Sequence, residues 1–295
     1  MGDQRDRKPA FTGGEARPVV LPALGAPCAD AHAHLDMLDD PAGALARAAE
    51  ADVALVASVV DLTDDPGRTL DGLDAWTGDA GERAGSATLP EVVLVAGVHP
   101  HNARLYDDGV DRRLAALARD DARVVALGEL GLDFHYDHSP RDSQRDMFKR
   151  QLALANRLDL PVIVHLREAH DEGAEILATE GVPHAGCVIH CFTEGPELAA
   201  RFLALSDAVL VSFAGPVTFA KADQIRRAVE VVPLDRMLVE TDCPFLTPTP
   251  YRGMPNEPAL TVLNAAKVAE VLDVGPAEVA SATLANARRL FRLTP

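Results

Sequence analysis

Short apolar runs alternate along the chain with longer stretches that mix apolar and charged positions. The short runs are rich in Val, Ile, Leu and Ala, which is typical of parallel strands covered on both faces. They predict eight strands, at residues 28–32, 53–60, 92–98, 124–127, 161–164, 187–191, 208–213 and 237–239.

The intervening stretches have the apolar spacing of amphipathic helices, as in residues 144–158, where Met147, Phe148 and Leu152 stand among charges. Further helices are expected at 197–205, 220–231, 265–272 and 276–290. Eight strand-and-helix units match an α/β fold of the (β/α)8 TIM-barrel type, which takes about 250 residues. A doubly wound open sheet is the competing architecture.

The domain organisation follows from the same pattern. Residues 28–295 contain no repeat, low-complexity tract or linker that would divide them, so we expect one catalytic barrel domain. Residues 1–27 carry Arg5 and Arg7 before a short apolar stretch broken by Pro22, which is a poor signal peptide. We expect this N-terminal extension to be flexible or loosely docked.

Composition narrows the possible partners. The 295 residues carry a formal net charge of −17, so a broad basic surface for nucleic acid or anionic membrane is excluded. No apolar run approaches the roughly 18 residues of a membrane span. The 4 cysteines suit a reducing cytoplasm, and the 4% aromatic content shows no basic stretch rich in stacking residues. No obligate protein partner is evident.

The reactive residues fall where the predicted strands end, and TIM-barrel enzymes build their sites at that end of the barrel. His32 and His34 are two residues apart, so an extended backbone projects both imidazoles from the same face. The full set of predicted metal ligands is His32, His34, Glu129, His165, His190 and Asp242.

Glu129 ends an apolar run, and a buried carboxylate is costly unless positive charge neutralises it. Metal ions are one partner, and an arginine in a structural ion pair is the alternative. Two divalent ions that share Glu129 would use all four imidazoles and both carboxylates of the predicted set. Such mixed nitrogen and oxygen ligands suit Zn, Mn, Co, Fe or Ni more naturally than Mg, which stays a further candidate.

Three other residues are expected to contact substrate. His99 and His101 follow the third strand and are expected near the substrate, as phosphate donors or as supports of the metal ligands, with a structural loop role as the equal alternative. Arg252 follows the last strand in a Pro-rich loop, where it either binds a phosphate or is a solvated charge. We expect Glu240 to orient a histidine.

The cysteines lie on or beside strands that carry predicted ligands, so a thiolate ligand is conceivable. Their spacing is not that of a zinc site, however. We expect buried structural thiols at Cys28, Cys187, Cys191 and Cys243.

The ordered motifs of the chain resemble the signatures of the TatD-type metal-dependent deoxyribonucleases over about residues 28–292. These motifs are DAHAHLD at 30–36, GVHPH at 97–101, GELGLDF at 128–134, PVIVH at 161–165, HCF at 190–192 and ETDCPFLTP at 240–248, with YRG at 251–253 and NEP at 256–258 also fitting. The chain departs from the pattern at Leu166 and at Thr193-Glu194, and these departures concern substrate preference.

The resemblance implies a metallo-hydrolase TIM barrel with two divalent ions. It places His32, His34 and Asp242 on one ion and His165 and His190 on the other, with Glu129 as the bridge. It implies a DNA substrate, cleaved from an end, with Asp242 and Glu129 as catalytic residues. Some relatives are instead described as deacylating D-aminoacyl-tRNA.

Two alternatives remain at this stage. An ester or amide hydrolase would use the same metal site, although amidohydrolases often bridge their metals with a carboxylated lysine where this chain has Glu129. A metal-bound but inactive binding protein is disfavoured, because the ligand set is complete. Metal identity, DNA against RNA, cleavage polarity and oligomeric state are not readable from the sequence.

Overall fold

The computed structural model describes residues 20–294 and contains one sheet of eight parallel strands, paired in chain order from β1 to β8. The fold class predicted from the apolar pattern is confirmed. The strands are β1 (Cys28–Ala33), β2 (Val53–Asp61), β3 (Glu91–Gly97), β4 (Val124–Asp133), β5 (Val162–Arg167), β6 (Cys187–Ile189), β7 (Val209–Phe213) and β8 (Met237–Val239).

The sheet closes into a barrel where the segment after β8 meets β1. The Asp242 N–H donates to His32 O at 2.9 Å, and the His34 N–H donates to Cys243 O at 2.9 Å. Below these bonds, buried Asp30 accepts hydrogen bonds from the amide and the hydroxyl of Thr241 at 2.7 and 2.6 Å. The doubly wound alternative is therefore wrong, because an open sheet would leave these edges apart.

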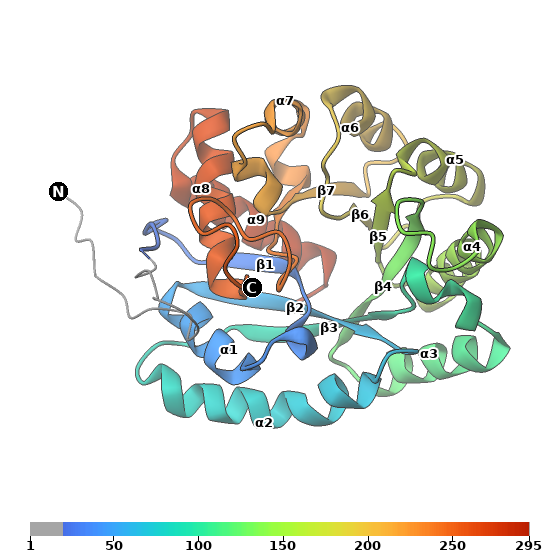
Figure 1. Cartoon of the computed structure of the whole chain (residues 1–295), viewed down its shortest axis with the longest axis horizontal. Coiled ribbons are helices and arrows are strands. Elements are labelled where there is room, and N and C mark those ends of the chain that lie inside the picture. Colours follow the sequence, from blue (N-terminus) through green and yellow to red (C-terminus); the bar gives the residue numbers. More distant parts are fainter. Residues whose placement is uncertain (1–19, 295) are drawn as a thin grey trace.

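The helices surround the ring of strands (Figure 1). Within residues 20–294 they are α1 (Pro41–Glu50), α2 (Pro66–Ala84), α3 (Asp108–Asp120), α4 (Arg141–Leu158), α5 (His170–Glu180), α6 (Pro196–Leu203), α7 (Asp223–Val231), α8 (Thr261–Leu272) and α9 (Pro276–Leu290). All five predicted helices are present, and the predicted 276–290 agrees with α9 at both ends.

Two apolar regions stabilise the barrel. The larger lies between the strands and the helices, and the smaller fills the barrel interior with side chains such as Leu55, Val95 and Ile163. Leu290 and Phe291, at the end of α9, belong to this interior cluster. The polar site must therefore lie beyond the apolar interior, at the carboxyl ends of the strands.

Several strand ends differ from the predicted ones. β4 continues to Asp133 and β5 to Arg167, whereas β6 ends at Ile189. The prediction ended these strands with their apolar runs, at Leu127 and Val164, but backbone pairing between β4 and β5 continues through Gly131 and His165. Glu129 and His165 therefore lie within strands, and His190 begins the loop after one.

The predicted N-terminal extension lies mostly outside the described residues, which exclude 1–19. Its described part contacts the barrel: the Val20 N–H donates to the Tyr251 hydroxyl at 2.7 Å, and Leu24 is buried. Among residues 20–294, no helix combines the length and the apolar character that crossing a bilayer requires.

Candidate metal centre

The first two histidines reach the centre through an irregularity in β1. Asp30 pairs with Val56 and Ala33 with Ser58, so β1 holds one residue more than β2 over this interval. Such an extra residue reverses the alternation of side chains. His32 and His34 consequently both face the barrel interior, although Ala31 also belongs to the interior cluster.

A second irregularity directs Glu129 inward. Leu127 pairs with Val162 and Leu130 with Val164, which again leaves one extra residue, here on β4. Leu127 and Leu130 both pack into the outer core. Between them, the side chain of Glu129 points into the barrel. Its side chain is buried, with 3% exposure.

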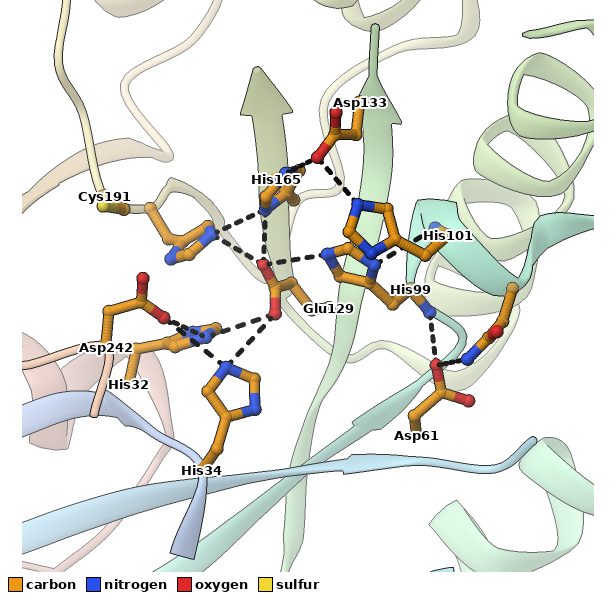
Figure 2. A network of polar contacts seen from close by, with 12 residues as sticks. His32, His34, Asp61, His99, His101, Glu129, Asp133, His165, Cys191 and Asp242 are labelled. Carbon is orange, nitrogen blue, oxygen red and sulfur yellow. Dashed lines mark hydrogen bonds and ion pairs between the residues drawn. The ribbon is translucent and has the colours of Figure 1, made fainter. Parts of the chain in front are cut away.

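Glu129 lies at the centre of a ring of imidazoles (Figure 2). Its Oε1 is 2.6 Å from His165 Nδ1 and 2.8 Å from His190 Nε2. Its Oε2 is 3.3 Å from His32 Nε2 and 3.7 Å from His34 Nε2. The structure thus places the four predicted imidazole ligands around the carboxylate of Glu129, the fifth member of the predicted set.

Asp242 completes the predicted set from the segment after β8. Its Oδ1 is 3.4 Å from His34 Nε2 and 3.8 Å from His32 Nε2. The backbone of Asp242 has a φ of 56°, a left-handed conformation that aspartate tolerates better than most residues. Buried Asn256 fixes this segment by donating to Thr241 O and Phe245 O at 2.9 and 2.6 Å.

Two further carboxylates orient the imidazoles. Glu240 Oε1 lies 3.1 Å from His190 Nδ1 and accepts the Cys191 N–H at 2.7 Å, as expected of a residue that orients a histidine. Asp133 Oδ2 lies 3.3 Å from His165 Nε2 and 2.9 Å from His101 Nε2. In both His190 and His165, a carboxylate engages one ring nitrogen and thereby orients the other nitrogen toward Glu129.

His99, predicted as a substrate contact, lies nearer the metal centre than expected. Its Nε2 is 3.7 Å from Glu129 Oε1. Its backbone N–H donates to Asp61 Oδ2 at 2.9 Å, and buried Gln151 of α4 makes two hydrogen bonds to Val98 at 3.0 Å. His99 is thus a further candidate ligand, held on a fixed loop.

The electrostatics are those of buried carboxylates that attract positive charge. Burial disfavours the ionised form of Glu129, but His190, His32 and His99 outweigh it and hold its pKa well below the usual range. Burial also opposes protonation of His190, yet Glu129 and Glu240 raise its pKa well above the usual value. Divalent cations can replace such protons, because metal binding to imidazole is linked to proton release.

The donor set fits divalent metal ions. His32 is fully buried, and neither of its ring nitrogens has a hydrogen-bond partner among the described residues. A buried polar atom without a partner is costly unless something satisfies it. Three groups of donors lie within 4.8 Å of one another: His32, His34 and Glu129; His32, His190 and Glu240; and His99, Glu129 and His165.

The alternative for Glu129, an ion pair with arginine, is wrong. Every ion-pair partner of Glu129 in residues 20–294 is a histidine. Imidazoles can bind a metal ion together with the carboxylate, whereas an arginine guanidinium would occupy the place of the metal ion.

The centre opens into a cavity of about 790 Å³, which Glu129, His34, His165 and Asp242 help to line. His101, predicted as a substrate contact, is among the residues that line the cavity. The structure does not place Arg252 among the cavity-lining residues; its guanidinium lies 4.0 Å from the ring centroid of Phe219.

Arg104 and Arg167 are the arginines that line the cavity, and sequence reasoning missed both. Arg167 lies two residues after His165, a spacing that places both side chains on one side of an extended strand.

Sequence reasoning also missed Gln144 and Gln151. Each interrupts the apolar face of a predicted helix, seven residues apart, and such buried polar residues must find partners.

The cysteines do not enter the candidate donor groups among residues 20–294. Burial raises the pKa of Cys28 and of Cys187 to about 12, which keeps both as protonated thiols. All four cysteines are free in the structure.

Comparison with known proteins agrees with the geometry. Residues 29–292 match the family described as TatD related DNase. The chain is 40% identical over 271 residues to an uncharacterized metal-dependent hydrolase, YcfH, of Escherichia coli K12, covering 90% of this chain and 95% of the relative. It is 37% identical over 204 residues to a protein of Erwinia tasmaniensis named 3′-5′ ssDNA/RNA exonuclease TatD, covering 67% and 77%. A solved TatD homologue of E. coli, YjjV, superposes with a TM-score of 0.79 at 30% identity, covering 90% and 98%.

Proposed function

Because the chain belongs to the TatD related DNase family and so to a family of metal-dependent hydrolases, we propose that it hydrolyses phosphodiester bonds of nucleic acid, DNA in particular, from a strand end. The observation that carries this proposal is the ring of imidazoles around buried Glu129, at the base of a cavity lined by two arginines. The exonuclease name of the Erwinia relative supports the substrate class.

We assign two divalent ions to the centre. His32, His34 and Asp242 would hold one, and His165 and His190 the other, with Glu129 between them and His99 within reach of the second. When bound, such ions stabilise negative charge on phosphoryl oxygens and lower the pKa of water. All these donors come from the described residues of this chain.

The residues of this chain then move one proton and orient the substrate. Hydrolysis forms a bond from the water oxygen to phosphorus and breaks the ester P–O bond. Asp242 accepts the proton of the water at Oδ2, because its Oδ1 faces His34 and His32 and would hold the ion, while the leaving oxygen takes a proton from solvent. Burial alone would raise the pKa of Asp242, but His34 and its neighbours lower it, so the carboxylate is ionised and ready to accept.

Arg104 and Arg167 are the residues that we expect to receive substrate phosphates. Both are exposed at the cavity, and guanidinium groups bind phosphate oxygens in a forked geometry. They take this role in place of Arg252, which is not among the residues that line the cavity. A cytoplasmic location, in which the four free thiols stay reduced, belongs to the same proposal.

The direct test is hydrolysis of an end-labelled single-stranded oligonucleotide by purified protein, with and without a chelator. Chelation should abolish turnover, and added divalent metal should restore it. Glu129→Gln should lower metal content and reduce turnover at least ~100-fold, whereas Glu230→Gln, on the exposed surface of α7, should retain both.

The same assay separates the alternatives. Single nucleotides as the first products indicate cleavage from an end, and internal fragments indicate cleavage within the strand. Turnover of amide or carboxylic ester substrates without any hydrolysis of DNA or RNA would contradict the nuclease proposal. Near-normal DNA hydrolysis by Glu129→Gln would remove Glu129 from the centre.

A further inference from the structure

Large apolar side chains are exposed at few places in residues 20–294, and the cavity mouth gathers most of them. Of the seven with substantial exposure, four line the cavity: Met37, Tyr136, Phe245 and Leu246. Exposed apolar groups that gather at one site mark a binding surface. These four residues come from segments far apart in the sequence. No single stretch of the chain therefore shows the cluster, and the overall aromatic content is low.

Phe245 stands on a rigid segment beside the metal centre. Its backbone N–H donates to Asp242 O at 3.0 Å, and its carbonyl accepts from Asn256 Nδ2 at 2.6 Å. Phe245 is nevertheless 50% exposed, and its ring centroid lies 6.0 Å from that of His34 in an edge-on arrangement. A planar group stacked on this ring would therefore lie next to a phosphate held at the centre.

Tyr136, the other exposed aromatic residue at the mouth, is already engaged. The guanidinium of Arg167 lies 4.7 Å from its ring centroid, and the ring of His138 is parallel to it at 5.4 Å. Arg104 donates to the carbonyl of His138 at 2.9 Å. This part of the mouth is polar and cationic, whereas Phe245 offers an aromatic face with only His34 as its aromatic neighbour among the described residues.

The size of the cavity limits what can reach Phe245. A volume of about 790 Å³ lies within the range of pockets that hold one small organic ligand. A duplex, whose major groove alone is about 12 Å wide, is too large to enter it. An unpaired nucleotide fits, and its base can stack on an aromatic ring whatever its identity.

We propose that Phe245 is the stacking platform for the unpaired base of the nucleotide whose phosphate lies at the metal centre, with Met37 and Leu246 as apolar neighbours. This inference rests on the proposed function and adds the residue that selects single-stranded ends. It makes Phe245 a residue that determines specificity through ground-state binding, so its loss should raise KM more than it lowers kcat.

Calorimetric titration tests the platform without turnover. The protein, with divalent metal present, is titrated with deoxyadenosine 5′-monophosphate and with 2-deoxyribose 5-phosphate, which lacks the base. The wild type should prefer the nucleotide by about ten-fold, as one stacked base provides. Phe245→Leu should lose that preference while Phe245→Trp keeps it. Val231→Ala, an exposed apolar residue of α7, is the matched control and should behave as the wild type.

A second measurement uses oligonucleotides with ordinary or abasic terminal nucleotides. Phe245→Leu should raise KM for the ordinary strand about ten-fold and leave KM for the abasic strand unchanged. Equal wild-type affinity for the two calorimetric ligands, or an unchanged KM in Phe245→Leu, would overturn the platform but not the nuclease. A wild type that prefers the nucleotide yet hydrolyses no strand would support the platform and overturn the proposed function.

Discussion

At the residue scale, the centre depends on side chains that orient the ligands. A neutral imidazole has one nitrogen that can bind a metal, so its other nitrogen must be engaged by a hydrogen-bond acceptor. Glu240 engages Nδ1 of His190, and Asp133 engages Nε2 of His165. Both carboxylates are almost fully buried, which suits groups that act on neighbours and not on substrate.

Glu240→Gln tests this orienting role. The glutamine keeps an oxygen that can accept from His190 and Cys191, so the fold should be retained while the negative charge is lost. We expect metal affinity to fall about 10-fold, within the range typical of residues that hydrogen-bond to a metal ligand. Titration of metal-free protein measures it, with Glu270→Gln, an exposed residue of α8, as control. Unchanged affinity in Glu240→Gln would show that the carboxylate does not tune His190.

At the element scale, the strands bring the donors together because they are irregular. The extra residues in β1 and β4 turn His32 and Glu129 inward; the irregularity of β1 lies at the carboxyl end of the strand, and that of β4 lies in its middle. β4 also contains Gly131, whose φ of +139° is one that residues with a Cβ rarely adopt. A Cβ at this position would lie 2.1 Å from the carbonyl oxygen of His165.

Gly131→Ala should therefore separate β4 from β5 and disturb the contact between Glu129 and His165. We expect a loss of about 1–3 kcal/mol in the free energy of unfolding, typical of overpacking, together with a large loss of activity. Denaturant unfolding followed by circular dichroism provides the measurement.

Gly78→Ala is the matched control in this comparison. Gly78 lies in the interior of α2, and an added methyl group would meet nothing within 4 Å apart from the adjacent backbone of its own helix, so alanine should add up to about 1 kcal/mol of stability. If Gly131→Ala unfolded at the same denaturant concentration as the wild type, the close approach of β4 and β5 would not constrain the site.

At the scale of the whole molecule, a net charge of −17 opposes the approach of a polyanion. Local cations at the cavity must offset this repulsion, and Arg104 and Arg167 are placed to do so. Each phosphate contact with a single strand changes the slope of log affinity against log salt concentration by about 0.7.

Arg167→Gln should consequently weaken single-strand binding and make that slope shallower by about 0.7. Equilibrium binding at several salt concentrations, under conditions without turnover, supplies the slopes. Arg119→Gln removes an exposed arginine of α3 away from the cavity and should leave the slope unchanged. A slope in Arg167→Gln equal to that of the wild type would place the phosphates elsewhere.

The sequence determined the order and type of the elements, because apolar periodicity is a local property of the chain. Eight apolar runs with helices between them predicted the barrel, and the polar residues that end these runs predicted six candidate ligands, whose side chains the structure brings to one place. The period of two also placed His32 and His34 on a common face, although it did not determine which face that is.

Only the tertiary structure decided which way those side chains point and what meets them. Ala31 and His32 both face inward, which a regular alternation forbids and the extra residue of β1 allows. Phe245 and Arg167 line the cavity and Arg252 does not, because the packing of distant segments shapes the cavity. Spacing along a chain fixes relations within one element, whereas contacts between elements depend on register and closure, which no single stretch of sequence contains.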